Sequence, residues 1–308
     1  MFRTLLKIVL AAVIAFSSLT YANEKPKIAF LMKTLSNEYF IKMQEGAQKA
    51  AATMGVDLII QVAEKEDSTE QLVALVENMI ASKVAAIVVT PNDSTAFVPV
   101  FLRAEQAGIP IIDLDVELDK KAAATAGLTY YYVGVDNFDG GYKAAKYLVD
   151  TLKGVGKVAI LEGIPGVDNG EQRKAGALKA FKEASGIEVV TIQTANWETE
   201  QALNVTTNIL TAHPDITGIF AANDNMAFGA VTAIENAGLI GKVHITGYDG
   251  LPLAYQYVKE GKMLCTIDQL PSEQAAKAIE FALKRIKKEE IPTHHMNELV
   301  IVTKENAI

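Results

Sequence analysis

Cysteine is almost absent from this chain, since Cys265 is the only one in 308 residues. A single cysteine excludes an intramolecular disulfide framework and any metal site built from several cysteines. Positive charge is also scarce, because 29 Lys and Arg stand against 37 Asp and Glu and leave a formal net charge of −8. Proteins that bind nucleic acids or anionic membranes usually carry a basic patch. We therefore expect neither as a partner.

Long hydrophobic runs are missing as well. Residues 8–16 are apolar throughout, but a helix needs about 20 apolar residues to span a bilayer. Arg3 and Lys7 precede this run, and small and polar residues ending at Ala22 follow it. This pattern is typical of a cleavable secretory signal peptide, which we predict at residues 1–22. Because no cysteine is nearby to carry a lipid, we expect a freely diffusing monomer in the periplasm.

Hydrophobic residues are plentiful, at 50% against 21% charged residues, as in packed globular proteins. The length predicts about two domains. Short, nearly continuous apolar runs alternate with segments of helical spacing, which predicts parallel sheets covered by helices on both faces. Residues 116–132 are expected to join two halves, and residues 270–308 to add one helix and a final strand. The predicted strands are 27–31, 58–62, 85–89, 111–114, 158–161, 189–192, 216–221, 243–247 and 264–267.

The two halves of the chain repeat one layout. Ile28 in the first predicted strand corresponds to Val158, about 130 residues later, and such self-similarity is the mark of a repeated unit. An Asn-Asp pair follows the third strand in both halves, beginning at Asn92 and at Asn223. The sequence therefore predicts an α/β fold of two similar, doubly wound lobes joined by short crossings.

Polar side chains collect directly after the predicted strands. In an open parallel sheet, ligands bind beyond the carboxyl ends of the strands. Asparagine and aspartate are also common turn formers, so any one of them has two interpretations. Their repetition at many strand ends favours a binding site. The residues concerned are Lys33, Asn37, Asn92, Asp93, Asp113, Asp115, Asn223, Asp224, Tyr248, Asp249, Asp268 and Gln269.

Motifs for catalysis and cofactor binding are absent from the sequence. It contains no Gly-x-Ser-x-Gly nucleophile elbow and no His-Glu-x-x-His metal motif. The glycines of residues 154–156 precede a predicted strand, so they cannot form a dinucleotide-binding turn. The acids that alternate over residues 113–119 lack the glycine of a calcium-binding loop. We therefore expect no enzyme activity, no cofactor and no metal.

Eight short stretches occur in one order along the chain. They are 34–40 (TLSNEYF), 90–94 (TPNDS), 114–115 (LD), 163–166 (GIPG) with Arg173, 210–215 (LTAHPD), 220–226 (FAANDNM), 247–250 (GYDG) and 269–271 (QLP). With them, residues 26–303 resemble the periplasmic sugar-binding proteins of ABC importers, in the ribose-binding-protein-like family of type I periplasmic binding proteins. The resemblance implies a sugar enclosed between lobes joined by a three-crossing hinge. The implied lobes are 23–135 plus 270–298, and 136–269 plus 299–308.

The resemblance also implies which side chains touch the sugar. Three aromatic residues would sandwich the sugar ring, and the polar residues would hold its hydroxyl groups. By position, the family contacts fall on Asn37, Tyr39, Phe40, Asp115, Arg173, Trp197, Asn223, Tyr248, Asp249 and Gln269.

Three positions depart from the ribose-binding pattern. Lys33 stands where a serine is usual, Val116 replaces an arginine after Asp115, and Glu171 replaces an arginine before Arg173. Losing guanidinium groups changes which hydroxyls can be bound. We therefore expect a hexose or a cyclic polyol such as myo-inositol in preference to ribose, with a cationic amino sugar as an alternative. Lys33 and Glu171 should lie on opposite lobes and either contact the ligand, pair across the cleft, or remain solvated.

Three classes of protein share such a fold, so the fold alone does not choose among them. The resemblance implies a binding subunit that closes on a sugar and presents it to a membrane permease, or to a chemoreceptor. A sugar-responsive repressor would need a helix-turn-helix ahead of residue 27, where the predicted signal peptide stands. An enzyme would need catalytic groups that are missing. The sequence therefore favours the transport subunit.

Overall fold

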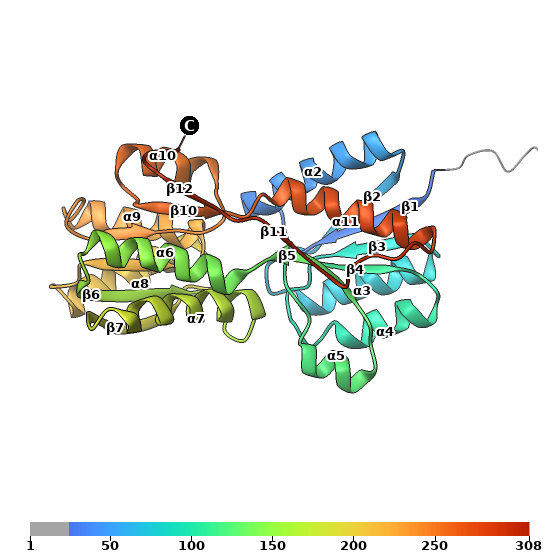
Figure 1. Ribbon diagram of the computed structural model, residues 1–308, viewed down its shortest axis with the longest axis horizontal. Coiled ribbons are helices and arrows are strands. Elements are labelled where there is room, and N and C mark those ends of the chain that lie inside the picture. The colour runs from blue at the N-terminus through green and yellow to red at the C-terminus, as the bar shows by residue number, and fades with distance from the viewer. Residues whose placement is uncertain (1–24, 308) are drawn as a thin grey trace, which may run out of the picture.

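Helices and strands alternate along the chain. The computed structural model describes residues 25–307; the predicted signal peptide lies outside them. Two six-stranded sheets divide the molecule into two lobes, which lie side by side in Figure 1. Among the described residues, no helix combines the length and apolar character needed to cross a membrane.

The first lobe is built on a sheet in which every neighbouring pair is parallel. In sheet order its strands are β11 (His294–Asn297), β5 (Tyr131–Val135), β4 (Ile111–Leu114), β3 (Ala86–Val89), β1 (Lys27–Met32) and β2 (Asp57–Val62). Its helices are α2 (Glu38–Met54), α3 (Thr69–Ala81), α4 (Val98–Gln106), α5 (Lys120–Ala126) and α11 (Pro271–Ile286).

Both faces of this sheet are buried. Ile28 of β1 packs in one apolar cluster with Met43 of α2, whereas its neighbour Ala29 packs in a second cluster with Leu72 of α3. Side chains alternate across a strand, so a strand covered on both faces must be apolar at every position. This is why the apolar runs predicted β1, β2, β3 and β4 and the layered α/β fold correctly.

The second lobe repeats the plan with one antiparallel edge strand, β12 (Val300–Thr303), which pairs with β10 (Cys265–Asp268). The other strands, in sheet order from β10, are β9 (His244–Thr246), β8 (Gly218–Ala221), β6 (Val155–Glu162) and β7 (Gly186–Thr194). The helices are α6 (Asn137–Thr151), α7 (Asp168–Glu183), α8 (Thr199–Ala212), α9 (Asp224–Asn236) and α10 (Pro252–Glu260). Two similar doubly wound lobes, as predicted, are confirmed.

The chain passes between the lobes three times, between β5 and α6, between β10 and α11, and between β11 and β12. Two sequence predictions are wrong at this level. Residues 116–132 are not a simple connection, because they contain α5 and the beginning of β5. Two strands follow α11 instead of one, since β11 has the polar and partly exposed sequence HHMN, which lacks the apolar run that marks a strand.

Candidate ligand-binding site

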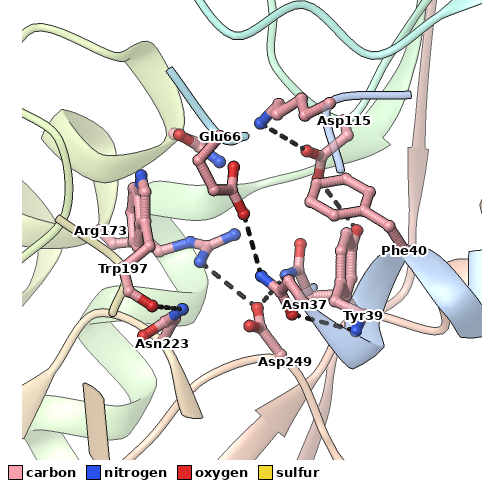
Figure 2. Close-up of a pocket in the computed structure, with 12 residues that line it drawn as sticks. Asn37, Tyr39, Phe40, Glu66, Asp115, Arg173, Trp197, Asn223 and Asp249 are labelled. Carbon is pink, nitrogen blue, oxygen red and sulfur yellow. Dashed lines mark hydrogen bonds and ion pairs between the residues drawn. The ribbon is translucent and has the colours of Figure 1, made fainter. Parts of the chain in front are cut away.

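Side chains from both lobes line one enclosed cavity beyond the carboxyl ends of the two sheets (Figure 2). The space between the lobes is small, and nearly all of the side chains that line it are buried. The first lobe contributes Lys33, Asn37, Tyr39, Phe40, Glu66 and Asp115, and the second lobe with the adjoining crossing contributes Asn169, Arg173, Trp197, Asn223, Asp249 and Gln269.

Aromatic rings face each other across the cavity (Figure 2). Tyr39 and Phe40 lie in the first turn of α2, with ring centroids 5.1 Å apart in an edge-to-face arrangement. Asn37 caps this helix, because its Oδ1 accepts a hydrogen bond from the Tyr39 N–H at 3.1 Å. Trp197 lies on the opposite side, in the second lobe. A flat ligand with apolar faces fits between these rings.

The indole of Trp197 is held by an unusual backbone. Asn196 and Trp197 have φ angles of 49° and 68°, in a left-handed region that non-glycine residues rarely adopt. The carbonyl of Trp197 accepts a hydrogen bond from Asn223 Nδ2 at 3.3 Å. Gly163 lies directly against the ring, since a Cβ at this position would be 2.0 Å from the indole. A glycine is therefore required at 163 for Trp197 to reach the cavity.

Asp115 is a buried hydrogen-bond acceptor of the first lobe. It follows β4 with a φ of 75° and is 3% exposed. Its Oδ1 accepts a hydrogen bond from Tyr39 Oη at 2.9 Å, and its Oδ2 lies 3.4 Å from Lys33 Nζ. Lys33 Nζ is also 5.3 Å from the ring centroid of Phe40, within cation–π range. A carboxylate has about four lone-pair sites and an ammonium three donors, so both groups keep capacity for ligand hydroxyls.

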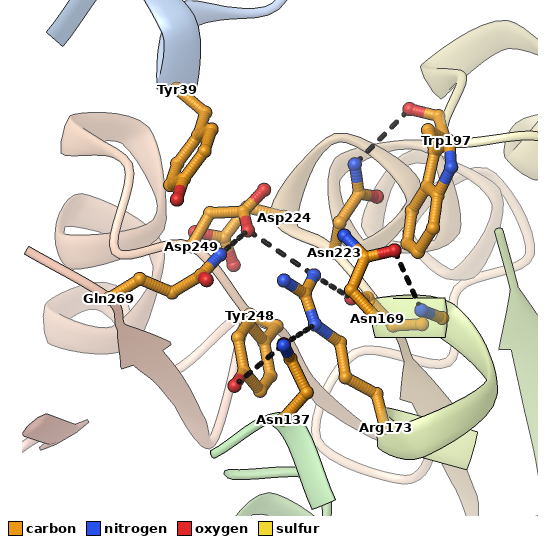
Figure 3. Close-up of polar contacts among 12 residues, drawn as sticks. Tyr39, Asn137, Asn169, Arg173, Trp197, Asn223, Asp224, Tyr248, Asp249 and Gln269 are labelled. Carbon is orange, nitrogen blue, oxygen red and sulfur yellow. Dashed lines mark hydrogen bonds and ion pairs between the residues drawn. The ribbon is translucent and has the colours of Figure 1, made fainter. Parts of the chain in front are cut away.

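Arg173 on α7 is the buried cation of the second lobe (Figure 3). Its Nε donates to Asn137 Oδ1 at 2.8 Å, its Nη1 donates to the Ala222 carbonyl at 2.9 Å, and Nη1 lies 3.5 Å from Asp249 Oδ1. Asp249 also accepts a hydrogen bond from Gln269 Nε2 at 2.7 Å. Burial raises the pKa of Asp249 to about 7, although Arg173 opposes this shift. Protein groups thus hold the guanidinium from several sides.

Tyr248 does not line the cavity, which corrects the prediction that it touches the ligand. Its ring is fully buried beneath Arg173, with the centroid 3.8 Å from the guanidinium carbon. Its hydroxyl donates to Asn137 Oδ1 at 3.4 Å. Gly140 leaves room for that hydroxyl, because a Cβ there would lie 2.3 Å from it. Tyr248 therefore positions Arg173 by stacking.

Glu171 also lies outside the cavity, so the predicted ligand contact is not formed. Its Oε2 pairs with Lys174 at 2.7 Å and its Oε1 accepts the Gly166 N–H at 3.0 Å. Lys33 pairs with Asp115 within its own lobe instead. The two residues lie on opposite lobes as expected. Of the three alternatives left open for them, the ion pair across the cleft is not formed, because each has a nearer partner of opposite charge.

Asn37 and Asn223 each combine a helix-capping role with a place in the cavity wall. Each caps a helix through its Oδ1, Asn37 at α2 and Asn223 at α9, where it accepts the Met226 N–H at 2.9 Å. Each nevertheless lines the cavity. The Nδ2 of Asn37 donates to Glu66 Oε1 at 3.2 Å. At these two positions a helix-capping role and a place in the cavity lining are combined.

Two cavity residues were not anticipated from the sequence, Glu66 and Asn169. Glu66 lies four residues after the end of β2. The sequence prediction considered only polar residues closer to the ends of the strands, so it did not include Glu66. Burial raises the pKa of Glu66, while Lys33 and the bond from Asn37 oppose the shift. Asn169 lies in the first turn of α7. In the sequence it stands between residues 163–166 and Arg173, which both carry the family resemblance, and this position is the signal that could have identified it.

The alternating acids of residues 113–119 have separate roles. Asp113 accepts the Leu118 N–H at 2.9 Å, and Asp119 caps α5. Glu117 accepts hydrogen bonds from Tyr130 and His294. Across residues 25–307 no group of three or more His, Cys, Asp or Glu side chains is arranged to hold a metal ion.

The charges of the cavity almost balance. Three carboxylates, Glu66, Asp115 and Asp249, stand against the cations Lys33 and Arg173. Each hydroxyl of a ligand is both a donor and an acceptor, so a lining of carboxylates, amides and cations can satisfy several hydroxyls at once. The arrangement suits a neutral, polyhydroxylated ring.

Comparisons with known proteins agree with this geometry. Residues 28–290 match the family described as periplasmic binding protein domain. The D-ribose/D-allose-binding protein of Pseudomonas aeruginosa is 37% identical over 92% of this chain and 90% of its own. The D-allose-binding periplasmic protein of Escherichia coli is 34% identical over 92% of this chain and 94% of its own.

One solved structure extends these relationships to three dimensions. It is an ABC transporter periplasmic solute binding protein from Actinobacillus succinogenes with bound D-allose. It is 67% identical in sequence, with a TM-score of 0.89 over 92% of this chain and 99% of that one. Together with the two-lobed fold and the enclosed polar cavity, these matches establish the family. This chain belongs to the periplasmic binding proteins, among the sugar-binding proteins of ABC transporters.

Proposed function

We propose that this protein binds D-allose, or a hexose very close to it, in the cavity between its lobes. The observation that carries the proposal is the lining itself, in which aromatic rings stand on two sides of a cavity edged by carboxylates, amides and two cations. The 67% identical Actinobacillus succinogenes protein was solved with D-allose. The relative at 37% identity is named for D-ribose and D-allose, and the relative at 34% identity for D-allose. A hexose also agrees with the expectation drawn from the three departures from the ribose pattern, at Lys33, Val116 and Glu171.

The sugar ring lies between Trp197 on one side and Tyr39 with Phe40 on the other. Lys33 and Asp115 bind hydroxyls from the first lobe, while Arg173 and Asp249 bind hydroxyls from the second. Because the ligand touches both lobes, it stabilises the closed arrangement more than an open one. Sugar therefore enters when the lobes part at the three crossings and is released when they part again.

In the cell, we propose that the chain is exported after cleavage of residues 1–22 and works in the periplasm as a monomer. The closed form presents both lobes to the permease of an ABC importer, which takes over the sugar. Support comes from the signal-like sequence of residues 1–22 and from the family of residues 28–290. The chain itself performs no chemistry on the sugar.

A thermal-shift panel tests the proposed ligand. The purified mature protein is heated with D-allose, D-ribose, D-glucose and myo-inositol at equal concentrations. A ligand at 100 times its dissociation constant adds about 2.7 kcal/mol to the free energy of unfolding, so D-allose should give the largest rise in melting temperature. A larger rise with D-ribose or myo-inositol, or no rise with D-allose, would reject D-allose as the ligand.

A further inference from the structure

Gln274 is a fully buried polar residue that does not line the cavity. It lies in the first turns of α11, the helix that directly follows the second crossing between the lobes. Its Nε2 donates one hydrogen bond to the Gln269 carbonyl at 2.8 Å and one to Tyr39 Oη at 3.3 Å. The same amide group thus touches the crossing on one side and the cavity wall on the other.

The direction of these hydrogen bonds is fixed by chemistry. A main-chain carbonyl such as that of Gln269 can only accept, so Gln274 must turn its NH₂ group toward it. The second N–H of that group then points to Tyr39 Oη, which accepts it. The phenol proton is left for the other neighbour of Tyr39, the Oδ1 of Asp115, at 2.9 Å. Burial and the adjacent Asp115 both raise the pKa of the Tyr39 phenol, so the proton stays on the tyrosine.

The close packing of α2 against α11 makes this contact possible. A Cβ at Gly46 of α2 would lie 2.4 Å from the Cα of Ser272 on α11, so only glycine permits this approach. Gln274 contributes little to the stability of the folded protein, because its Oε1 is buried without a hydrogen-bond partner among the described residues. An unsatisfied buried acceptor costs free energy. The value of the side chain therefore lies in the two bonds made by its Nε2.

We propose that Gln274 is a positioning residue for sugar recognition: through Tyr39 it fixes the Asp115 carboxylate and ties it to the second crossing between the lobes. Asp115 then offers the ligand acceptors in a preset orientation, and the crossing and the sugar site move together. This inference rests on the proposed function, because it assigns the way in which one wall of the same cavity is held. Gln274 acts only through Tyr39 and does not itself touch the sugar.

A double-mutant cycle with Gln274→Leu and Tyr39→Phe tests the bridge. Tyr39→Phe keeps the aromatic face and removes only the hydroxyl. Each single variant should raise the dissociation constant for D-allose about 3- to 10-fold, the range expected for one hydrogen bond. The double variant should be no weaker than the weaker single variant, because both changes break one chain of bonds. Ser272→Ala is the matched control, since it removes another α2–α11 hydrogen bond, from Ser272 Oγ to the Lys42 carbonyl at 2.9 Å, and should leave binding within twofold.

Two results would overturn the proposal. One is a Gln274→Leu protein that folds and binds D-allose like the wild type; the other is a double variant whose loss equals the product of the single losses. If the wild type does not bind D-allose at all, the proposed ligand is rejected on that result alone. The cycle is then measured without sugar, as unfolding free energies in denaturant. There, strictly additive losses would reject the bridge and coupled losses would support it.

Discussion

Lys33 and Asp115 form an ion pair in which both side chains are almost wholly buried, with exposures of 5% and 3%. Burying charge is expensive, and such a pair adds little stability compared with apolar residues of the same volume. It is therefore better explained by recognition. Asp115 uses one oxygen for Tyr39 and the other for Lys33, and Lys33 keeps two N–H groups for a ligand.

The first prediction separates the two charged residues that depart from the ribose pattern. Lys33→Met should weaken D-allose binding at least about tenfold, because it removes charged donors and leaves Asp115 unpaired. Glu171→Gln should change the affinity less than twofold, because Glu171 is bound to Lys174 and Gly166 away from the cavity. Calorimetric titration of both variants provides the comparison. An equal loss in the two would show that Glu171 reads the ligand after all.

The sequence predicted cavity-lining residues well where they lie within two residues of a strand end. Asp115, Asn223 and Gln269 belong to this group, and all three line the cavity. The prediction failed where the orientation of the side chain decides whether it reaches the cavity. Tyr248 also follows a strand, but its ring turns beneath Arg173, and no pattern in the chain encodes that rotation.

At the level of helices and strands, the site is made by the loops that leave the two sheets. Asp115, Trp197 and Asp249 all line the cavity and all have positive φ angles, of 75°, 68° and 127°. Backbone strain of this kind persists only where the surrounding structure holds it. Strands such as β1 and β8 were predictable because burial on both faces makes them continuously apolar. The polar edge strand β11 was not, because its sequence carries no such signal.

The second prediction concerns the loop that supports Trp197. Gly163→Ala should displace the indole and weaken sugar binding at least about tenfold, since the new methyl group would overlap the ring. The chain has one tryptophan, so its fluorescence reports this displacement directly. We expect a shifted emission maximum in the variant without sugar.

Gly218→Ala is the control for this experiment. It adds a methyl group to a strand of the same lobe, where the three nearest atoms belong to the flexible side chain of Leu148, at 3.0 to 3.3 Å. Emission and affinity should both stay close to the wild type. Wild-type emission and affinity in the Gly163→Ala protein would mean that the ring is not held by this glycine.

At the scale of the whole molecule, contacts between the lobes accompany the closed cavity. Lys42 Nζ of α2 donates to the Gly250 carbonyl at 2.9 Å, and the Asp168 N–H of α7 donates to Ser94 Oγ at 3.4 Å.

The sequence repeat predicted two similar lobes, because similar layouts follow one another along the chain. The repeat could not give these contacts, since they join segments that are far apart and have no common pattern.

The third prediction is a pH dependence of closure. Burial is the main cause that raises the pKa of Asp168 to about 6, and the charge of Glu117 in the opposite lobe is the second. Asp119 adds to this shift, whereas the hydrogen bond from Gln172 and the charge of Lys120 oppose it. The ordinary value for aspartate is about 3.9. The closed protein therefore binds more protons than the open one between about pH 4 and 6, so closure weakens as pH rises through that window.

Asp168→Asn isolates this effect, because asparagine resembles the protonated acid at every pH. The variant and the wild type should bind D-allose equally at the low end of the window, and the variant should bind more tightly above pH 6. Titrations at several pH values give the ratio of the two dissociation constants. A ratio that does not change with pH would remove Asp168 from the account of closure.

The central claim is that one sugar of the D-allose type is enclosed between the lobes and held by Asp115. Calorimetric titration of D-allose into the mature wild type and into Asp115→Asn tests it most directly. We predict one saturable site per wild-type chain, and a loss of at least about tenfold in affinity in the variant, which keeps the shape of the side chain but lacks its charge. Absence of heat in the wild type, or the same affinity in both proteins, would contradict the account.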